Sequence, residues 1–351
     1  MDIFSTAQLN AVADNTEEAV TPILDMFFPD IEISDKEEIK FDNKPLKRRL
    51  SPFVAPFVQG KVVKRNGFKT ETFTPAYIKD KRVFEPSANL KRRAGEPIGG
   101  TLTPAQRLQA AVADEIADMK DMRERRLETM AMEILRTGKV TVKGEGFGTV
   151  VVDFGRNANH TVTLAGAAAW DQAGVSPLAN IKTWSSTVLK NSGKAVTDVI
   201  MDTLAYASFT ADQSVKDALD IRRGAPAQAE LAQLAELGLQ FNGTIGNTRY
   251  WTYQNWYEDP DTGTETSMIP DNTVILVSKG LAGVRHFGAI KDIKSQSATD
   301  VSGNNGDGSF SRDIFIKSWD EEDPSVRYLM GQSAPLLVPY FVDATFCVTT
   351  K

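Results

Sequence analysis

The sequence has few of the residues on which enzymes and metal proteins depend. Its single cysteine is Cys347, and its two histidines, His160 and His286, lie far apart along the chain. One cysteine excludes an intrachain disulfide framework and fits a reducing compartment. The apolar residues around Cys347 predict a buried thiol rather than a nucleophile. The histidines do not form an i, i+4 metal-binding pair. Counting does not exclude a Ser-His-Asp or Cys-His arrangement, but no Gly-x-Ser-x-Gly motif is present. We therefore expect no catalytic residues, no cofactor and no metal site.

Long hydrophobic runs and an overall basic charge are also absent. No signal peptide or transmembrane segment is predicted, so we expect a protein that is made and used without crossing a membrane. A net charge of −6 and a pI of about 5.2 argue against a dedicated nucleic-acid-binding protein. The charge is uneven, because residues 36–93 hold 16 Lys and Arg but only 6 Asp and Glu. This asymmetry predicts complementary contacts, within the chain or between copies.

The basic region contains the strongest turn signal. Asn66-Gly67 supplies the two positive φ angles of a type I′ turn and stands between two strand-forming segments, residues 61–65 and 68–73. Arms of about ten residues would reach about 30 Å. A two-stranded hairpin is marginal in water by itself. We predict a hairpin that projects from the chain and lies on another surface.

Residues 103–137 are predicted to form one long helix. Thr103 is a good N-cap, Pro104 suits the first helical position, and Gly138 suits the end. About 34 residues would give a rod of roughly 50 Å. Apolar residues recur every three or four positions, at Leu108, Val112, Ile116, Met119, Met122, Leu127, Met130 and Ile134. Arg123 interrupts this stripe and no heptad is sustained, so a helix lying on a sheet is favoured over a coiled-coil strand. The opposite face is expected to carry Asp114, Asp118, Asp121, Arg125 and Glu128.

The rest of the chain predicts a mixed α and β protein of two or three domains. Strands are expected near residues 139–142, 149–154, 196–201, 239–245, 249–257, 273–277, 334–342 and 345–349, and helices near 178–191, 203–223 and 226–237. Gly144–Gly148 resembles a phosphate-binding loop, but a strand follows it, so a tight turn is favoured. Residues 297–311 are expected to form a mobile loop. Alternate members of the aromatic cluster at 251–257 are expected to face the core, with base stacking as the less favoured reading.

The first 50 residues are predicted to be a polar arm with one apolar segment at residues 23–29. This segment is too short and too acidic for a membrane anchor. We expect it to dock onto a neighbouring surface.

Seven short phrases, in order along nearly the whole chain, resemble the tailed-phage major capsid proteins of the lambda capsid protein E family. They begin at Thr6 (TAQL), Phe73 (FTPAYIK), Leu90 (LKRR), Val150 (VVVDFGR), Leu219 (LDIRRG), Ile269 (IPDNTV) and Gln332 (QSAPLL). The resemblance implies an α+β, HK97-like capsid fold. Its parts would be an N-terminal arm (1–50), an extended β-hairpin E-loop (51–88), a peripheral domain with a long spine helix on a β-sheet (89–169 and 326–351) and a mixed α/β axial domain (170–325).

The resemblance also implies where subunits touch. Contacts are expected from the E-loop at Lys61, Lys64, Arg65, Asn66, Gly67 and Lys69, and from the N-terminal arm at Phe27, Phe28, Lys47, Arg48 and Arg49. No covalent Lys–Asn cross-link between loops is expected.

The implied function is a major capsid protein that self-assembles into the hexamers and pentamers of an icosahedral phage head. The head would enclose double-stranded DNA without sequence-specific binding. Implied partners are further copies of the chain, a separate scaffolding protein, a portal and a decoration protein, and assembly is expected in the host cytoplasm before the protein resides in the virion. Two alternatives stay open: an encapsulin-like compartment shell, and a ligand-binding or enzymatic protein that uses residues 170–325.

Overall fold

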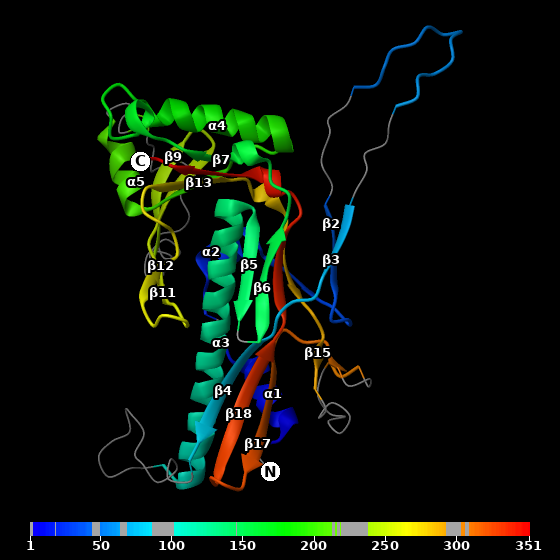
Figure 1. The fold of residues 1–351 in the computed structure, drawn as a ribbon, viewed down its shortest axis with the longest axis vertical. Helices are drawn as coiled ribbons and strands as arrows, with labels where there is room; N and C mark the ends of the chain where they lie inside the picture. The colour runs from blue at the N-terminus through cyan, green and yellow to red at the C-terminus, as the bar shows by residue number, and fades with distance from the viewer. Residues whose placement is uncertain are drawn as a thin grey trace.

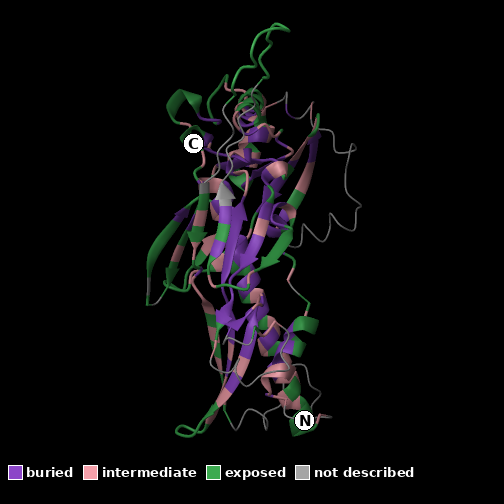
Figure 2. Ribbon diagram, turned by 90° about the vertical axis from the view of Figure 1, so that its right-hand side faces the viewer, coloured by how far each residue is buried: buried purple, intermediate pink, exposed green. Residues whose placement is uncertain are grey.

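The computed structural model describes residues 3–17, 19–43, 50–63, 69–85, 102–144, 146–212, 215, 218, 238–292, 303–305 and 309–351. The molecule is elongated, with one long helix running through its lower part and a sheet covered by helices at its upper end (Figure 1). A core of buried residues follows the long axis, whereas the projecting segment at the top is exposed (Figure 2). The fold is mixed α and β, as the sequence predicts.

The predicted long helix is confirmed as α3 (Pro104–Thr137). The Thr103 hydroxyl accepts a hydrogen bond from the backbone N–H of Gln106, and the Gln106 side chain accepts one from the backbone N–H of Thr103 at 2.9 Å. Gly138 ends the helix with a φ of 72°, and its N–H donates to the carbonyl of Ile134. A cap of this kind stabilises a helix by about 1 kcal/mol. Thr103, Pro104 and Gly138 therefore occupy the predicted capping positions.

The polar residues of α3 differ from the prediction. Lys120, Arg123, Glu124 and Glu128 are all buried. Arg123 does not break the buried face, because its guanidinium bonds to the carboxylates of Glu124 and Asp313. The placement of Glu128 on the exposed face is wrong. Buried charges require partners, and these partners come from distant parts of the chain.

The upper part of the molecule contains a six-stranded sheet. Its strand order is β7 (Thr161–Thr163), β20 (Thr345–Thr349), β13 (Thr273–Val277), β8 (Asp198–Met201), β10 (Thr248–Tyr253) and β9 (Leu239–Ile245). Helices α4 (Pro177–Ser192) and α5 (Thr203–Ala211) cover one face. Alternate residues of β13 pack on opposite faces of the sheet. Val274 belongs to the core beneath α4 and α5, and Ile275 belongs to the core on the side of α3. Both faces of the sheet are therefore buried.

Smaller sheets extend the body along α3. One joins β17 (Phe315–Glu321), β18 (Val326–Ser333) and β4 (Ile78–Phe84), and another joins β1 (Asp30–Ile33), β14 (Gly283–Phe287) and β19 (Pro335–Pro339). The paired strands are β5 (Lys139–Gly144) with β6 (Phe147–Asp153), β2 (Ile39–Asn43) with β3 (Lys69–Phe73), β11 (Trp256–Glu258) with β12 (Glu265–Ser267), and β15 (Ile290–Lys291) with β16 (Ser309–Phe310). Helices α1 (Thr6–Asn15) and α2 (Pro22–Phe27) precede them in the chain.

Domain boundaries were expected near residues 170 and 326, but strands from the two sides of these boundaries pair with each other. Strands β7 and β20 were assigned to the peripheral domain, yet they lie in one sheet with β8, β9, β10 and β13. Strands β14 and β17 were assigned to the axial domain, yet they pair with strands beside α3. The two-domain division stays a prediction, and hydrogen bonding does not follow its expected boundaries.

Most of the other expected elements are present where the structure describes the chain. Gly146 lies between β5 and β6 with a φ of 69°, where the turn was expected, although Gly144 and Gly148 are strand residues. Trp251 and Tyr253 face the core, while Trp256 is half-exposed. The mobile loop was expected to extend to residue 311, but Ser309 and Phe310 are buried and form a strand. The helix expected at 226–237 lies outside the described residues.

Candidate functional site

Residues 50–63, which lie between β2 and β3, are all exposed. These strands are antiparallel, with Ile39 opposite Phe73 and Asn43 opposite Lys69, so the chain leaves and returns at one place. Residues 50–63, the projecting loop, extend away from the body (Figure 1). The predicted pairing of residues 61–65 with 68–73 is wrong, because β3 pairs with β2. Lys64, Arg65, Asn66 and Gly67 lie outside the described residues, whereas Lys61 is described and exposed.

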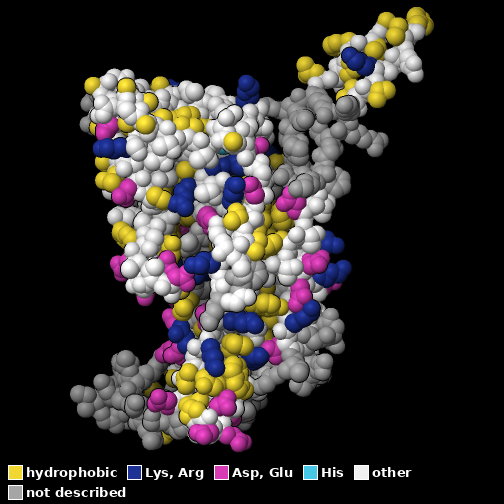
Figure 3. Space-filling view, viewed as in Figure 1, with side chains coloured by type: hydrophobic (Ala, Val, Ile, Leu, Met, Phe, Trp, Pro, Cys, Tyr) yellow, Lys and Arg dark blue, Asp and Glu magenta, His cyan; other side chains and the backbone are white. Residues whose placement is uncertain are grey.

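The projecting loop carries large apolar side chains that are exposed. Phe53 and Phe57 are fully exposed, and Leu50 and Val62 are nearly so. Apolar side chains cover the loop in the space-filling view (Figure 3). Burying one such side chain stabilises a complex by about 1.5–3 kcal/mol. An apolar surface of this kind marks an interaction site. The contacts predicted for this region were Lys, Arg and turn residues, and the apolar residues of the loop were not among them.

The N-terminal segment does not behave as a free arm. Phe27 and Phe28 were expected to contact a neighbouring subunit, but both are buried in the chain's own core. This prediction is wrong because α2 is bonded to the body: the Arg285 side chain donates to the carbonyl of Phe28 at 2.7 Å and pairs with Asp25. Lys47, Arg48 and Arg49 lie outside the described residues.

Helix α1 is attached in the same way. The side chain of Asn10 donates to the carbonyl of Ile316 at 2.8 Å and accepts from its N–H at 3.0 Å, as a strand partner would. The ammonium group of Lys120 donates to the carbonyls of Ala13 and Thr16 at the end of α1. The buried Lys120 thus bonds the last turn of α1 to α3.

Glu128 connects three elements in the middle of the molecule. Its carboxylate accepts hydrogen bonds from the backbone N–H groups of Ile23 and Leu24 and from the hydroxyl of Tyr253. Burial raises the pKa of Glu128 to about 7, although these three hydrogen bonds oppose the shift. The negative charge of Asp25 raises the pKa further. The pKa of the Tyr253 hydroxyl is also raised, first by burial and then by Glu128.

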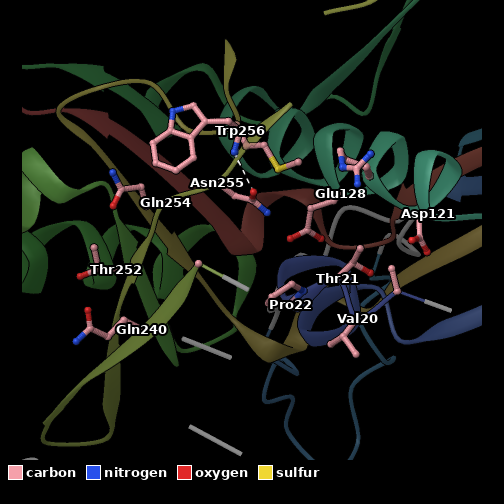
Figure 4. A pocket seen from close by; sticks show the side chains of 14 residues that line it. Val20, Thr21, Pro22, Asp121, Glu128, Gln240, Thr252, Gln254, Asn255 and Trp256 are labelled. Atoms are coloured by element: carbon pink, nitrogen blue, oxygen red, sulfur yellow. Dashed lines mark hydrogen bonds between the residues drawn. The ribbon is translucent and has the colours of Figure 1, made fainter. Parts of the chain in front are cut away.

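A polar cleft of about 560 Å³ lies beside Glu128. Thr21, Pro22, Asp121 and Glu128 lie on one side of it, and Gln240, Thr252 and Gln254 lie on the other, with Asn255 and Trp256 between (Figure 4). The Thr21 hydroxyl oxygen is buried and has no hydrogen-bond partner among the residues that the structure describes. Leaving such a group unpaired costs roughly 1–3 kcal/mol.

The candidate catalytic and metal-binding residues are separate from one another. His160 and His286 are both buried, and burial lowers the pKa of each. Cys347 is buried as predicted, and burial raises the pKa of its thiol to about 11. The described residues include no group of three metal-ligating side chains. None of the helices within the described ranges has the length and apolarity needed to cross a membrane.

Known proteins resemble the chain over its whole length. The major capsid protein of Escherichia phage N15 is 29% identical over 344 residues, and that of phage lambda is 28% identical over 344 residues, each alignment covering 96% of both chains. The crystal structure of a prophage protein from Escherichia coli CFT073 superposes with a TM-score of 0.75 at 22% identity, covering 99% of both chains. The capsid of cyanophage A-1(L) gives a TM-score of 0.53 at 12% identity, covering 96% of this chain and 94% of the other.

These neighbours have the HK97-like capsid fold that the sequence phrases predict. The family model described as phage major capsid protein E matches residues 5–350. The chain belongs to the phage major capsid protein E family.

Proposed function

We propose that this major capsid protein builds an icosahedral phage head from hexamers and pentamers that enclose double-stranded DNA. The observation that supports this proposal most directly is the projecting loop, whose Phe53 and Phe57 are fully exposed in the single chain. A fold that leaves such residues uncovered gains stability when another subunit covers them. We propose that the E-loop contacts are made by this apolar segment together with Lys61, Lys64, Arg65 and the neighbouring residues of the loop.

Charge supports the same assembly. The region of residues 36–93 is basic, whereas the chain as a whole carries a net charge of −6. Opposite charges on two copies would steer the loop of one onto the acidic surface of the other. An acidic wall also avoids binding the phosphates of the packaged DNA, because a basic lining would hold them strongly. DNA would therefore be enclosed without sequence-specific contacts.

Assembly implies further partners. We propose that a separate scaffolding protein directs closure, that a portal occupies one vertex, and that a decoration protein binds the outer surface. Assembly would take place in the host cytoplasm before the head becomes part of the virion. The family match favours a phage head over an encapsulin-like compartment, and the relatives are structural proteins rather than enzymes.

The test is assembly of the purified chain with and without its apolar loop residues. We expect the wild-type chain to form closed particles or capsomers in electron micrographs and in sedimentation. The double variant Phe53→Ser, Phe57→Ser is expected to stay unassembled, while its thermal unfolding matches the wild type. The control Phe53→Leu, Phe57→Leu keeps the loop apolar and is expected to assemble. Normal particles from the serine variant would contradict the role of the loop.

A further inference from the structure

The sheet of β17, β18 and β4 has two faces of different character. On its inner face, Ile316 of β17 and Leu329 of β18 are fully buried in a core with α1 and α3. Side chains alternate across a strand, so the neighbours of Leu329 point to the opposite side. This opposite side, which we call the outer face, carries Lys79, Lys81, Val83, Trp319, Tyr328 and Met330.

The outer face has an apolar centre. Trp319 lies opposite Tyr328, and Tyr328 lies opposite Val83 in the strand register. The Trp319 and Tyr328 rings pack together with their centroids 5.4 Å apart, and Val83 is 56% exposed. Apolar and basic side chains lie together over the lower end of the body, where β4 and β18 run (Figure 1, Figure 3). Trp, Tyr and Met are the residues enriched at the centres of protein interfaces.

Two lysines of β4 lie beside this centre and lack an acidic partner. The ammonium group of Lys81 lies 3.5 Å from the centre of the Tyr328 ring. Neither Lys79 nor Lys81 forms a salt bridge with a residue that the structure describes, whereas Lys317 on β17 pairs with Asp292. The outer face therefore holds positive charge that its own surroundings leave uncompensated.

The inner face of the same strand differs. Arg82, the residue after Lys81, points towards α3 and pairs with Glu115 and Asp118. The segment that follows β4, residues 86–101, contains three basic residues in a row and one acidic residue, Glu96. Its charge is of the same sign as that of the outer face. The negative charge that would complement Lys79 and Lys81 is therefore expected from another molecule.

The arrangement of the rings favours a protein over a nucleic acid. Bases stack on the open faces of aromatic rings. Here the ammonium group of Lys81 covers one face of the Tyr328 ring by a cation–π contact, so a base would first have to displace it. A carboxylate can pair with Lys81 while it stays over the ring, and an aliphatic side chain can cover Val83. An acidic segment with apolar side chains fits both requirements.

We propose that the outer face binds a separate protein through an acidic segment, whose carboxylates pair with Lys79 and Lys81 and whose apolar side chains cover Trp319, Tyr328 and Val83. This inference rests on the proposed function, in which the head binds further proteins. It names the surface that one of them uses and the chemistry by which that protein is recognised.

Peptide binding to the full-length chain tests the inference. The probe is a fluorescein-labelled peptide of about ten residues made of Glu-Glu-Leu repeats, and we expect a saturable rise in anisotropy that weakens with salt. Lys79→Glu with Lys81→Glu should weaken binding at least about tenfold, and Val83→Thr about two- to fivefold. Lys182→Glu with Lys279→Glu changes the net charge equally at exposed sites elsewhere and should bind as the wild type does. Absence of binding, or equal binding by the Lys79 and Lys81 variant, would overturn the inference.

Two further measurements separate the other occupants. A short oligothymidine that binds the wild type more tightly than the peptide, and that loses binding in Lys79→Glu with Lys81→Glu, would assign the face to a nucleic acid and overturn the inference. The same variant is expected to assemble normally when no other protein is present. Loss of particles in this variant but not in Lys182→Glu with Lys279→Glu would show that a second copy of the chain occupies the face. That result would overturn the inference and leave the proposed function intact.

The converse result is also distinguishable. A wild-type chain that forms no particles but still binds the peptide through Lys79 and Lys81 would contradict the proposed function and support the assignment of the outer face.

Discussion

The carboxylate of Glu128 accepts a hydrogen bond from the backbone N–H of Leu24 at 2.8 Å. It accepts a second from Ile23 at 3.1 Å, so the long helix supplies the cap that α2 lacks. Thr21 occupies the N-cap position of α2 but makes no side-chain capping bond. Residues more than 100 positions apart are thereby joined, and the N-terminal segment is attached to the centre of α3.

We expect the stability of the chain to fall as the pH rises through neutrality. The pKa of Glu128 in the folded chain is about 7, above its ordinary value of 4.5. The folded state therefore binds the proton more tightly than the unfolded state, and this contribution is complete below about pH 4.5 and is lost as the pH rises through 7. Between pH 5.5 and 8.5 the free energy of unfolding should fall by about 2 kcal/mol.

Urea unfolding of the wild type and of Glu128→Gln across this range checks the prediction. Glutamine cannot ionise, so the difference between the two proteins isolates Glu128 from His160 and His286. The pKa values of these histidines are lowered by burial, and they act in the opposite direction with pH. Parallel pH profiles for the two proteins would contradict the assignment.

Removing the Glu128 side chain should loosen α2. In Glu128→Ala the N–H groups of Ile23 and Leu24 lose their acceptor, and the buried Tyr253 hydroxyl keeps the sulfur of Met268 at 3.1 Å. The expected loss is about 2–3 kcal/mol in the free energy of unfolding. Amide hydrogen exchange should quicken in residues 23–28. Arg125→Ala, one turn earlier on the exposed face of α3, is the control and should change stability by less than about 0.5 kcal/mol. Unchanged exchange in Glu128→Ala would show that the cap is not needed.

The buried ion pairs of Arg123 should be costly to break. Its guanidinium lies 2.6 Å from Glu124 and 2.6 Å from Asp313, and Arg123 and Glu124 are both almost fully buried. Arg123→Ala leaves the buried Glu124 carboxylate without this partner and should cost about 3–5 kcal/mol. Arg327→Ala breaks an exposed pair with Asp320 and should cost about 0–1 kcal/mol. Chemical denaturation of both variants compares the two losses, and similar values would refute this distinction.

Reversing the charge of Lys64 and Arg65 should block assembly without affecting the fold. Lys64→Glu with Arg65→Glu places negative charge on a segment that is expected to meet an acidic neighbour. We expect an unchanged melting temperature and no closed particles by electron microscopy. Lys64→Arg with Arg65→Lys keeps the charge and should assemble. Normal particles from the charge-reversed chain would argue against the E-loop assignment of this segment.

The sequence predicts local features well. Capping residues and three- to four-residue periodicity locate α3, because the signals lie within the helix itself. The apolar run Thr273–Val277 appears as a strand with the predicted ends, since it is buried on both faces. These elements depend on neighbours in the sequence.

Features set by distant partners are predicted poorly. The Asn66-Gly67 signal predicts a turn, but it does not say that Lys69–Phe73 will pair with Ile39–Asn43. Glu128 and Arg123 look like exposed helix residues because their partners, Leu24 and Asp313, lie about 100 and 190 positions away. The cleft at Trp256 is assembled from α2, α3 and three strands, and no motif in the sequence announces it.

A cryo-electron microscopy map of the assembled particle tests the central claim most directly. The proposed function predicts density for residues 50–63 lying on an adjacent subunit, with Phe53 and Phe57 covered by it. A chain that remains monomeric at high concentration, or particles in which this segment lies against its own body, would contradict it.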